Sequence, residues 1–98
     1  MIEVRKTEEF ERWLRALRDR AARTKILVRI DRLTLGNPGD VRAVGGGISE
    51  MRIDHGPGYR AYFTHLGPVL IIILCGGDKD RQERDIRRAK EIAAGLED

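Results

Sequence analysis

Basic and phenolic side chains lie on neighbouring strands that the sequence predicts in the middle of this 98-residue chain. Arg60 and Tyr62 alternate with apolar residues along one segment, and Arg52 alternates in the same way along the segment before it. Because alternate residues of a strand point to one face of a sheet, we expect the three side chains on an open face, opposite an aliphatic face covered by helices. A guanidinium beside a phenol suits the binding of a phosphodiester. An ordinary solvated sheet face is the alternative interpretation of this pattern.

More cations follow the most apolar segment of the chain. Cys75-Gly76-Gly77-Asp78-Lys79 leads from a predicted buried strand into a predicted helix, and backbone N–H groups at a helix start can bind an anion. Lys79 and Arg81 flank this start, so we expect them to complete an anion site. A solvated capping segment is the alternative interpretation.

Other kinds of catalytic site find little support in the sequence. The lone Cys75 can form neither an internal disulfide nor a multi-thiolate metal site. His55 and His65 lie in turns at either end of one predicted strand, about 30 Å apart if that strand is extended, which is too far to share a metal ion. Gly45-Gly46-Gly47 lacks the Lys-Ser/Thr pair of a phosphate loop, so we expect a flexible turn there. No metal, cofactor or protease triad is predicted.

Apolar periodicity predicts the elements that must position these side chains. Residues 2–5 alternate as a short strand that pairs with the later sheet. Thr7 is the expected N-cap of a first helix, and a break near Asp19 separates it from a second helix that Gly36 and Pro38 end. The apolar stripes of this helical hairpin are Phe10, Trp13, Leu14 and Leu17, then Ala22, Ile26, Ile30 and Leu33.

The middle of the chain predicts a sheet. Residues 50–54 and 59–64 alternate on either side of the turn His55-Gly56-Pro57-Gly58, and residues 41–44 make one more short strand. The unbroken apolar run at 69–74 indicates a strand with both faces covered. Asp78 or Asp80 is expected to cap a last helix. Its predicted buried side holds Ile86, Ala89, Ala93 and Leu96.

Composition limits the classes of protein to consider. With 41% hydrophobic and 36% charged residues, the chain is expected to fold as one domain over residues 1–98. Its longest apolar run has six residues, whereas a membrane span needs about 18, so we expect neither a membrane segment nor a signal peptide. A single cysteine fits the reducing cytoplasm. The net charge of +3 slightly favours anionic partners.

Several strings of residues carry a resemblance to a known family. They are Gly36-Asn37-Pro38-Gly39-Asp40, Gly45-Gly46-Gly47-Ile48-Ser49-Glu50-Met51-Arg52, Gly56-Pro57-Gly58-Tyr59-Arg60-Ala61-Tyr62-Phe63, Leu74-Cys75-Gly76-Gly77-Asp78-Lys79, Arg84-Asp85-Ile86 and Ala89-Lys90. Over essentially its whole length the chain resembles the HigB-like addiction-module killer proteins of the RelE/ParE toxin superfamily. The resemblance implies an α+β fold of the RelE-like kind: an N-terminal strand and helical hairpin packed on a small, mainly antiparallel sheet, with a C-terminal helix.

The resemblance also implies a function. RelE-like and HigB-like toxins are ribosome-dependent mRNA endoribonucleases that need no metal; the 2′-hydroxyl attacks the adjacent phosphate and leaves a cyclic phosphate. ParE-like relatives instead inhibit DNA gyrase, and this is the alternative for the present chain. The implied partners are mRNA on the ribosome and an antitoxin from the adjacent gene. That antitoxin is a helix-turn-helix protein, so operator DNA is expected to be bound only through it.

Site residues can be carried over from the family one position at a time. Arg60, in Gly58-Tyr59-Arg60, matches the strand arginine that these toxins place against the scissile phosphate. Lys79 and Arg81 fall where the family keeps its second basic pair, and Lys79 is a candidate general base. His55 is the alternative base, because HigB-like enzymes use a histidine near this strand.

One departure concerns the general acid or base. RelE uses a tyrosine of its last helix, whereas residues 83–88 contain none, so the role passes to Tyr62 or Tyr59. Tyr62 is preferred because it shares the face of Arg60. Arg52 and Tyr59 are assigned to RNA binding.

Overall fold

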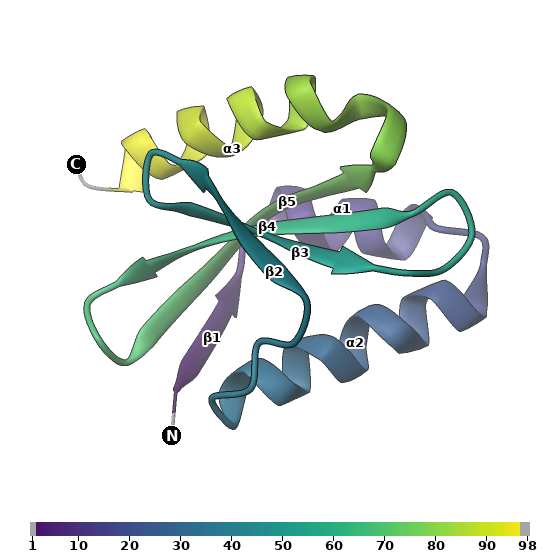
Figure 1. The fold of residues 1–98 in the computed structure, drawn as a ribbon, viewed down its shortest axis with the longest axis horizontal. Coiled ribbons are helices and arrows are strands. Elements are labelled where there is room, and N and C mark those ends of the chain that lie inside the picture. Colours follow the sequence, from purple (N-terminus) through teal and green to yellow (C-terminus); the bar gives the residue numbers. More distant parts are fainter. Residues whose placement is uncertain (1, 97–98) are drawn as a thin grey trace.

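The computed structural model describes residues 2–96, and it contains a five-stranded sheet and three α-helices (Figure 1). The strands are β1 (Glu3–Lys6), β2 (Val41–Gly45), β3 (Ile48–Ile53), β4 (Tyr59–Leu66) and β5 (Leu70–Asp78); the helices are α1 (Glu8–Ala16), α2 (Arg20–Thr34) and α3 (Gln82–Leu96). Their order across the sheet is β1-β5-β4-β3-β2. Only the β1–β5 pair is parallel. The predicted α+β fold, with its N-terminal strand in a mainly antiparallel sheet, is confirmed.

The helical hairpin forms where Thr7 and the break near Asp19 predict it. The Thr7 hydroxyl accepts a hydrogen bond from the Phe10 amide at 3.0 Å, and the Asp19 carboxylate accepts one from the Ala22 amide at 3.2 Å. Each cap satisfies a backbone donor that the helix leaves free. Both helices cover the same face of the sheet (Figure 1). The core on this face comprises Phe10, Leu14, Ile26, Ile30, Leu33, Met51, Ile53, Ala61, Phe63, Ile71 and Ile73.

The opposite face of the sheet is covered in part by α3 (Figure 1). A second core of Ile48, Tyr62, Ile72, Leu74, Cys75 and Ala89 lies there. The unbroken apolar run of β5 has both faces covered, as predicted, because Ile71 and Ile73 lie in the first core and Ile72 and Leu74 lie in the second. A bulge, where pairing passes from Phe63 with Ile73 to Tyr62 with Cys75, puts Cys75 on the α3 side as well. The expectation that this face is open is therefore wrong for the half under α3.

The start of α3 is built by Asp78. Its carboxylate accepts a hydrogen bond from the Asp80 amide at 3.1 Å and caps a 3-10 turn, η1 (Lys79–Arg81), from which α3 continues. Of the side predicted to be buried, Ala89 is buried but Leu96 is 37% exposed, so the apolar contact ends before the last turn. No helix within residues 2–96 is long and apolar enough to cross a membrane.

Candidate functional site

A cavity of about 480 Å³ opens where β3, β4 and η1 meet, beyond the second core. Arg52 and Arg60 line it from two strands, on which they are direct cross-strand partners, and Lys79 lines it from η1. The turn Gly56-Pro57-Gly58 closes one side. Three residues that the sequence singled out therefore line one cavity, and their roles stay a prediction. We call it the Arg60 cavity.

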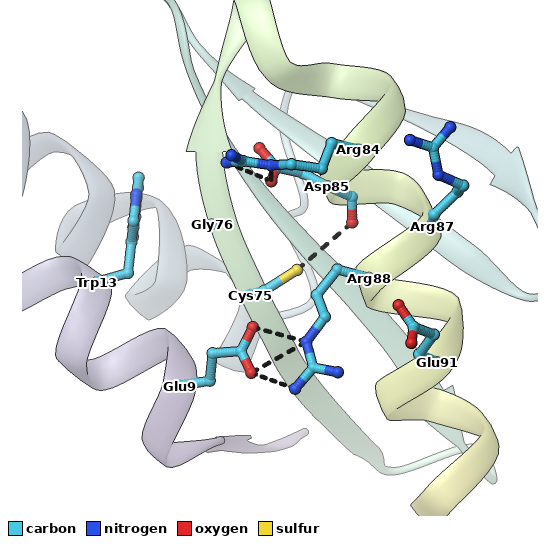
Figure 2. Close-up of a pocket in the computed structure, with 9 residues that line it drawn as sticks. All are labelled: Glu9, Trp13, Cys75, Gly76, Arg84, Asp85, Arg87, Arg88 and Glu91. Atoms are coloured by element: carbon cyan, nitrogen blue, oxygen red, sulfur yellow. Dashed lines mark hydrogen bonds and ion pairs between the residues drawn. The ribbon is translucent and has the colours of Figure 1, made fainter.

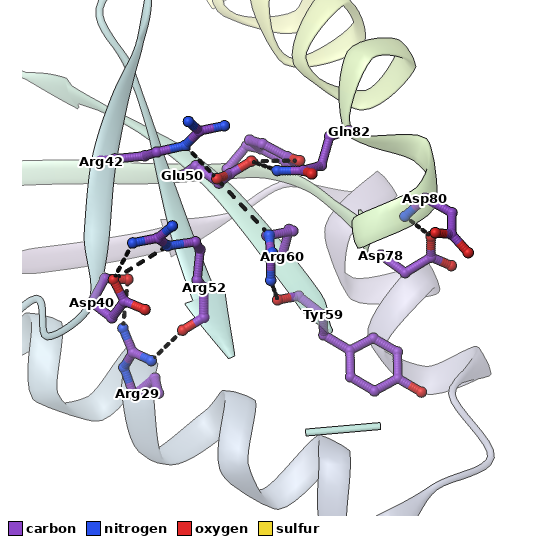
Figure 3. Close-up of polar contacts among 11 residues, drawn as sticks. Arg29, Asp40, Arg42, Glu50, Arg52, Tyr59, Arg60, Asp78, Asp80 and Gln82 are labelled. Carbon is purple, nitrogen blue, oxygen red and sulfur yellow. Dashed lines mark hydrogen bonds and ion pairs between the residues drawn. The ribbon is translucent and has the colours of Figure 1, made fainter. Parts of the chain in front are cut away.

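Arg60 is held in place before any ligand arrives. Its side chain is only 12% exposed. One terminal nitrogen, Nη1, donates to the Tyr59 carbonyl at 3.1 Å, and Nε lies 3.9 Å from Oε1 of Glu50 (Figure 3). Nε is buried and has no hydrogen-bond partner. Nε therefore lies towards Glu50 and not towards a ligand. A guanidinium that is already fixed can bind an anion through its terminal nitrogens with little loss of side-chain entropy.

Glu50 is the centre of the polar network beside the cavity, and sequence reasoning missed it. Its carboxylate is fully buried and accepts hydrogen bonds from Arg42 Nε at 2.9 Å, Gln82 Nε2 at 2.9 Å and Tyr62 Oη at 3.1 Å. Burial alone would raise the pKa of Glu50, but these three hydrogen bonds outweigh it and hold the pKa below its ordinary value. Glu50 thus remains a buried anion that attracts Arg60.

Tyr62 does not stand on an open face. It is fully buried within the second core and donates to Glu50. Burial and the adjacent Glu50 charge raise its pKa well above the ordinary value. In this structure Tyr62 positions Glu50 and makes no surface on which a substrate could rest.

Arg52 is anchored by an acidic neighbour. Its Nε and Nη2 donate to Oδ1 of Asp40 at 3.2 and 2.8 Å. Arg29 of α2 in turn donates to the carbonyls of Arg52, Pro38 and Asp40, which ties the segment before β2 to the end of β3 (Figure 3). The Arg52 cation is therefore oriented but partly neutralised.

Two predicted residues lie away from the Arg60 cavity. His55 Nε2 is 2.8 Å from Oδ2 of Asp19, the cap of α2, and this hydrogen bond lowers the pKa of Asp19. Tyr59 packs on the face of α1 and α2, with its ring edge-on to Trp13 at 6.1 Å between centroids. Neither side chain lines the cavity. This geometry therefore gives no support to His55 as a general base or to Tyr59 as an RNA contact.

Arg81 lies in a neighbouring depression of about 420 Å³ that it shares with Lys79. Asp54, which the sequence analysis did not single out, is an exposed carboxylate on the rim of the Arg60 cavity. Its position just after β3 and before the glycine turn is the signal that could have found it.

Gly76 and Gly77 do not form part of the helix start at which an anion site was predicted. Both glycines lie within β5. A Cβ on Gly76 would stand 2.4 Å from the Trp13 ring, and a Cβ on Gly77 would stand 1.8 Å from Oδ2 of Asp85. The glycines therefore admit a side chain from α1 on one face and from α3 on the other. Cys75 is also buried, which raises the pKa of its thiol to about 12.

Within residues 2–96, His, Cys, Asp and Glu form no group of three or more that could hold a metal ion. The candidate site is the Arg60 cavity, lined by Arg52, Arg60 and Lys79, beside the buried carboxylate of Glu50. It is carried by a sheet with a helical pair on one face and a C-terminal helix on the other, which is a RelE-like architecture.

Comparison with known proteins places the chain in a family. The chain belongs to the family described as Phage derived protein Gp49-like (DUF891), which matches residues 12–95 and is part of the RelE/ParE-like toxin superfamily. An uncharacterized protein of Haemophilus influenzae is 47% identical over 95 residues, which cover 97% of this chain and 96% of the relative. The family is of the toxin type of toxin-antitoxin systems and implies an antitoxin partner. The superfamily prediction is confirmed, whereas the narrower HigB-like assignment stays a prediction.

Proposed function

We propose that this protein is a ribosome-dependent mRNA endoribonuclease of the HigB-like kind, acting in the cytoplasm as the toxin of its module. One observation carries the proposal: Arg60 is fixed between Glu50 and the Tyr59 carbonyl at a cavity that Arg52 and Lys79 also line. A preorganised guanidinium stabilises charge that develops on a phosphate in the transition state. Family membership supports the same reaction class.

The proposed reaction makes specific demands on the cavity. The 2′-oxygen attacks phosphorus, the bond to the 5′-oxygen breaks, and the products are a 2′,3′-cyclic phosphate and a 5′-hydroxyl. Arg60 binds the phosphate oxygens as charge accumulates on them. One proton must leave the 2′-hydroxyl and one must reach the 5′-oxygen. Lys79 and Asp54 line the cavity without taking part in the Arg52–Asp40 ion pair, and they are the proposed carriers of these protons.

Dependence on the ribosome follows from the small number of groups available. The cavity is open and supplies few acid or base side chains, so correct orientation of the mRNA must come from elsewhere. The ribosome would provide that orientation. Purified protein should barely cut naked mRNA and should cut the same mRNA on translating ribosomes. Similar cleavage rates on both substrates would contradict the proposal.

The antitoxin is proposed to be the helix-turn-helix protein encoded by the adjacent gene, which would also bind the operator. Coexpression of that gene should restore the growth of cells that make the toxin and should yield a complex that copurifies. Operator DNA should bind the complex but not the toxin alone. Growth inhibition that the neighbouring gene leaves unchanged would argue against this pairing.

A further inference from the structure

A second cavity lies outside the Arg60 cavity, between α1 and α3 at the end of β5 (Figure 2). It measures about 400 Å³, which is within the range of small-ligand sites, roughly 300–1,000 Å³. Glu9 and Trp13 line it from α1, and Arg84, Asp85 and Arg88 line it from α3. We call it the Trp13 cleft. Nothing in the proposed reaction uses it.

Shared side chains link the Trp13 cleft to the Arg60 cavity. The depression of about 420 Å³ around the start of α3 shares Lys79 with the Arg60 cavity, and it shares Arg84 and Arg87 with the Trp13 cleft. Four cations line this depression, the three just named together with Arg81, against two carboxylates. A cationic path of this kind can follow a nucleic-acid backbone.

The Trp13 cleft, at the end of this path, has the features of a site for a nucleobase. Trp13 is half-buried and is fixed against Gly76, with the Phe10 ring at 5.7 Å and the Tyr59 ring at 6.1 Å. A rigid indole is a stacking surface that accepts any base. The cleft is lined by as many carboxylates as arginines. It therefore favours an uncharged nucleobase over a phosphate group.

The cleft also offers hydrogen-bond acceptors. Asp85 is not one of them, because its Oδ2 is buried against Gly77 and its Oδ1 accepts from Arg84 at 3.2 Å. Glu9 is oriented by Arg88, whose Nη2 and Nε donate to it at 2.6 and 3.0 Å (Figure 2). Carboxylate oxygens accept hydrogen bonds from the exocyclic amino groups of bases.

We propose that the Trp13 cleft is a nucleobase subsite: single-stranded RNA runs from Arg60 past Lys79, Arg81 and Arg87 around the start of α3, and one flanking nucleobase stacks on Trp13 and donates to Glu9. The identity of the ligand as RNA rests on the proposed function. RNA is favoured over a protein segment because a depression lined by four cations lies between the cleft and the Arg60 cavity, and because the cleft combines cations with an aromatic ring.

Trp13 is the single tryptophan of the chain, so its fluorescence reports on the cleft directly. A short 2′-O-methyl oligoribonucleotide, which cannot be cleaved by its own 2′-oxygen, should quench Trp13 emission to saturation at low salt. Arg87→Glu should weaken this binding roughly tenfold and lower the slope of log Kd against log salt by about one. Lys25→Glu makes the same change of charge on α2, away from the cleft, and should bind like the wild type.

The outcomes separate this proposal from the proposed function. Saturable quenching that Arg87→Glu weakens supports the subsite even where no ribosome-dependent cleavage is found, a result that would overturn only the nuclease. Cleavage on ribosomes by wild type and Arg87→Glu alike, with Trp13 emission insensitive to RNA, would overturn the subsite alone. Quenching of Trp13 emission by purified antitoxin but not by RNA would assign the cleft to the protein partner and would also overturn the proposed RNA subsite.

Discussion

Replacing Arg60 by alanine removes the guanidinium that Glu50 and the Tyr59 carbonyl hold at the Arg60 cavity. The variant loses the hydrogen bond to the Tyr59 carbonyl and the ion pair with Glu50. Glu50 keeps its hydrogen bonds from Arg42, Gln82 and Tyr62, so no unpaired buried charge results. We expect the free energy of unfolding to fall by only about 1–2 kcal/mol, from one hydrogen bond and the packing of a nearly buried stem.

The effect on catalysis should be larger than the effect on stability. Losing one preorganised contact to the transition state slows a chemical step about 100-fold to 1,000-fold, or roughly 3–4 kcal/mol. The assay is single-turnover cleavage of mRNA on programmed ribosomes, with urea denaturation of the same samples. Arg60→Lys should restore only part of the rate, because an ammonium cannot make a bidentate contact with two phosphate oxygens.

Arg42→Ala is the matched control, because Arg42 also donates to Glu50 but does not line the Arg60 cavity. It should lose a similar amount of stability and keep near-normal cleavage. Phe63→Ala, in the core under the helical hairpin, should cost about 3–5 kcal/mol and mark the effect of unfolding. Full cleavage by Arg60→Ala, or equal losses of rate in Arg60→Ala and Arg42→Ala, would refute the assignment of Arg60 to the phosphate.

Three further predictions concern the buried groups. Glu50→Gln should destabilise the protein by about 2–4 kcal/mol at neutral pH; because the folded-state pKa of Glu50 lies below its ordinary 4.5, melting curves of wild type and variant should converge as the pH falls through that pKa. For Asp85 the sign is opposite: burial raises its pKa above 3.8, so its ionisation lowers the free energy of unfolding as the pH rises, and Asp85→Asn should be more stable than the wild type at neutral pH and equally stable in acid. Gly77→Ala places a Cβ against Asp85 and should cost about 1–3 kcal/mol in urea denaturation, most of it restored by adding Asp85→Ala.

The parts of the fold and site that sequence could predict are those fixed by local pattern. Alternation along β3 and β4 placed Arg52 and Arg60 on one face, and a short glycine turn set the register that makes them cross-strand partners. Thr7 caps α1 as expected, because a cap depends only on the residues that follow it. The predicted break near Asp19 is the start of α2, which Asp19 itself caps.

The parts that sequence could not predict depend on contacts between distant segments. Glu50 looks like a solvated strand residue until Arg42, Tyr62 and Gln82 converge on it from three elements. The same packing of α3 buries Tyr62, which alternation alone would leave exposed.

Gly76 and Gly77 show the same limit. Their sequence is typical of a loop, and only the positions of Trp13 and Asp85 reveal that each glycine makes room for a helix side chain. Local pattern therefore predicted that Arg52 and Arg60 share a face of the sheet, but neither the cavity nor the buried network beside it.

The most direct test of the central claim is a map of mRNA 5′ ends in growing cells after induction of the wild-type protein or of Arg60→Ala. If the protein cleaves mRNA on the ribosome and Arg60 binds the phosphate, the wild type should produce new 5′ ends at in-frame positions within translated codons. Arg60→Ala should produce none of them at an equal protein level. Intact mRNA together with DNA damage would contradict this claim and would assign the protein to gyrase inhibition instead.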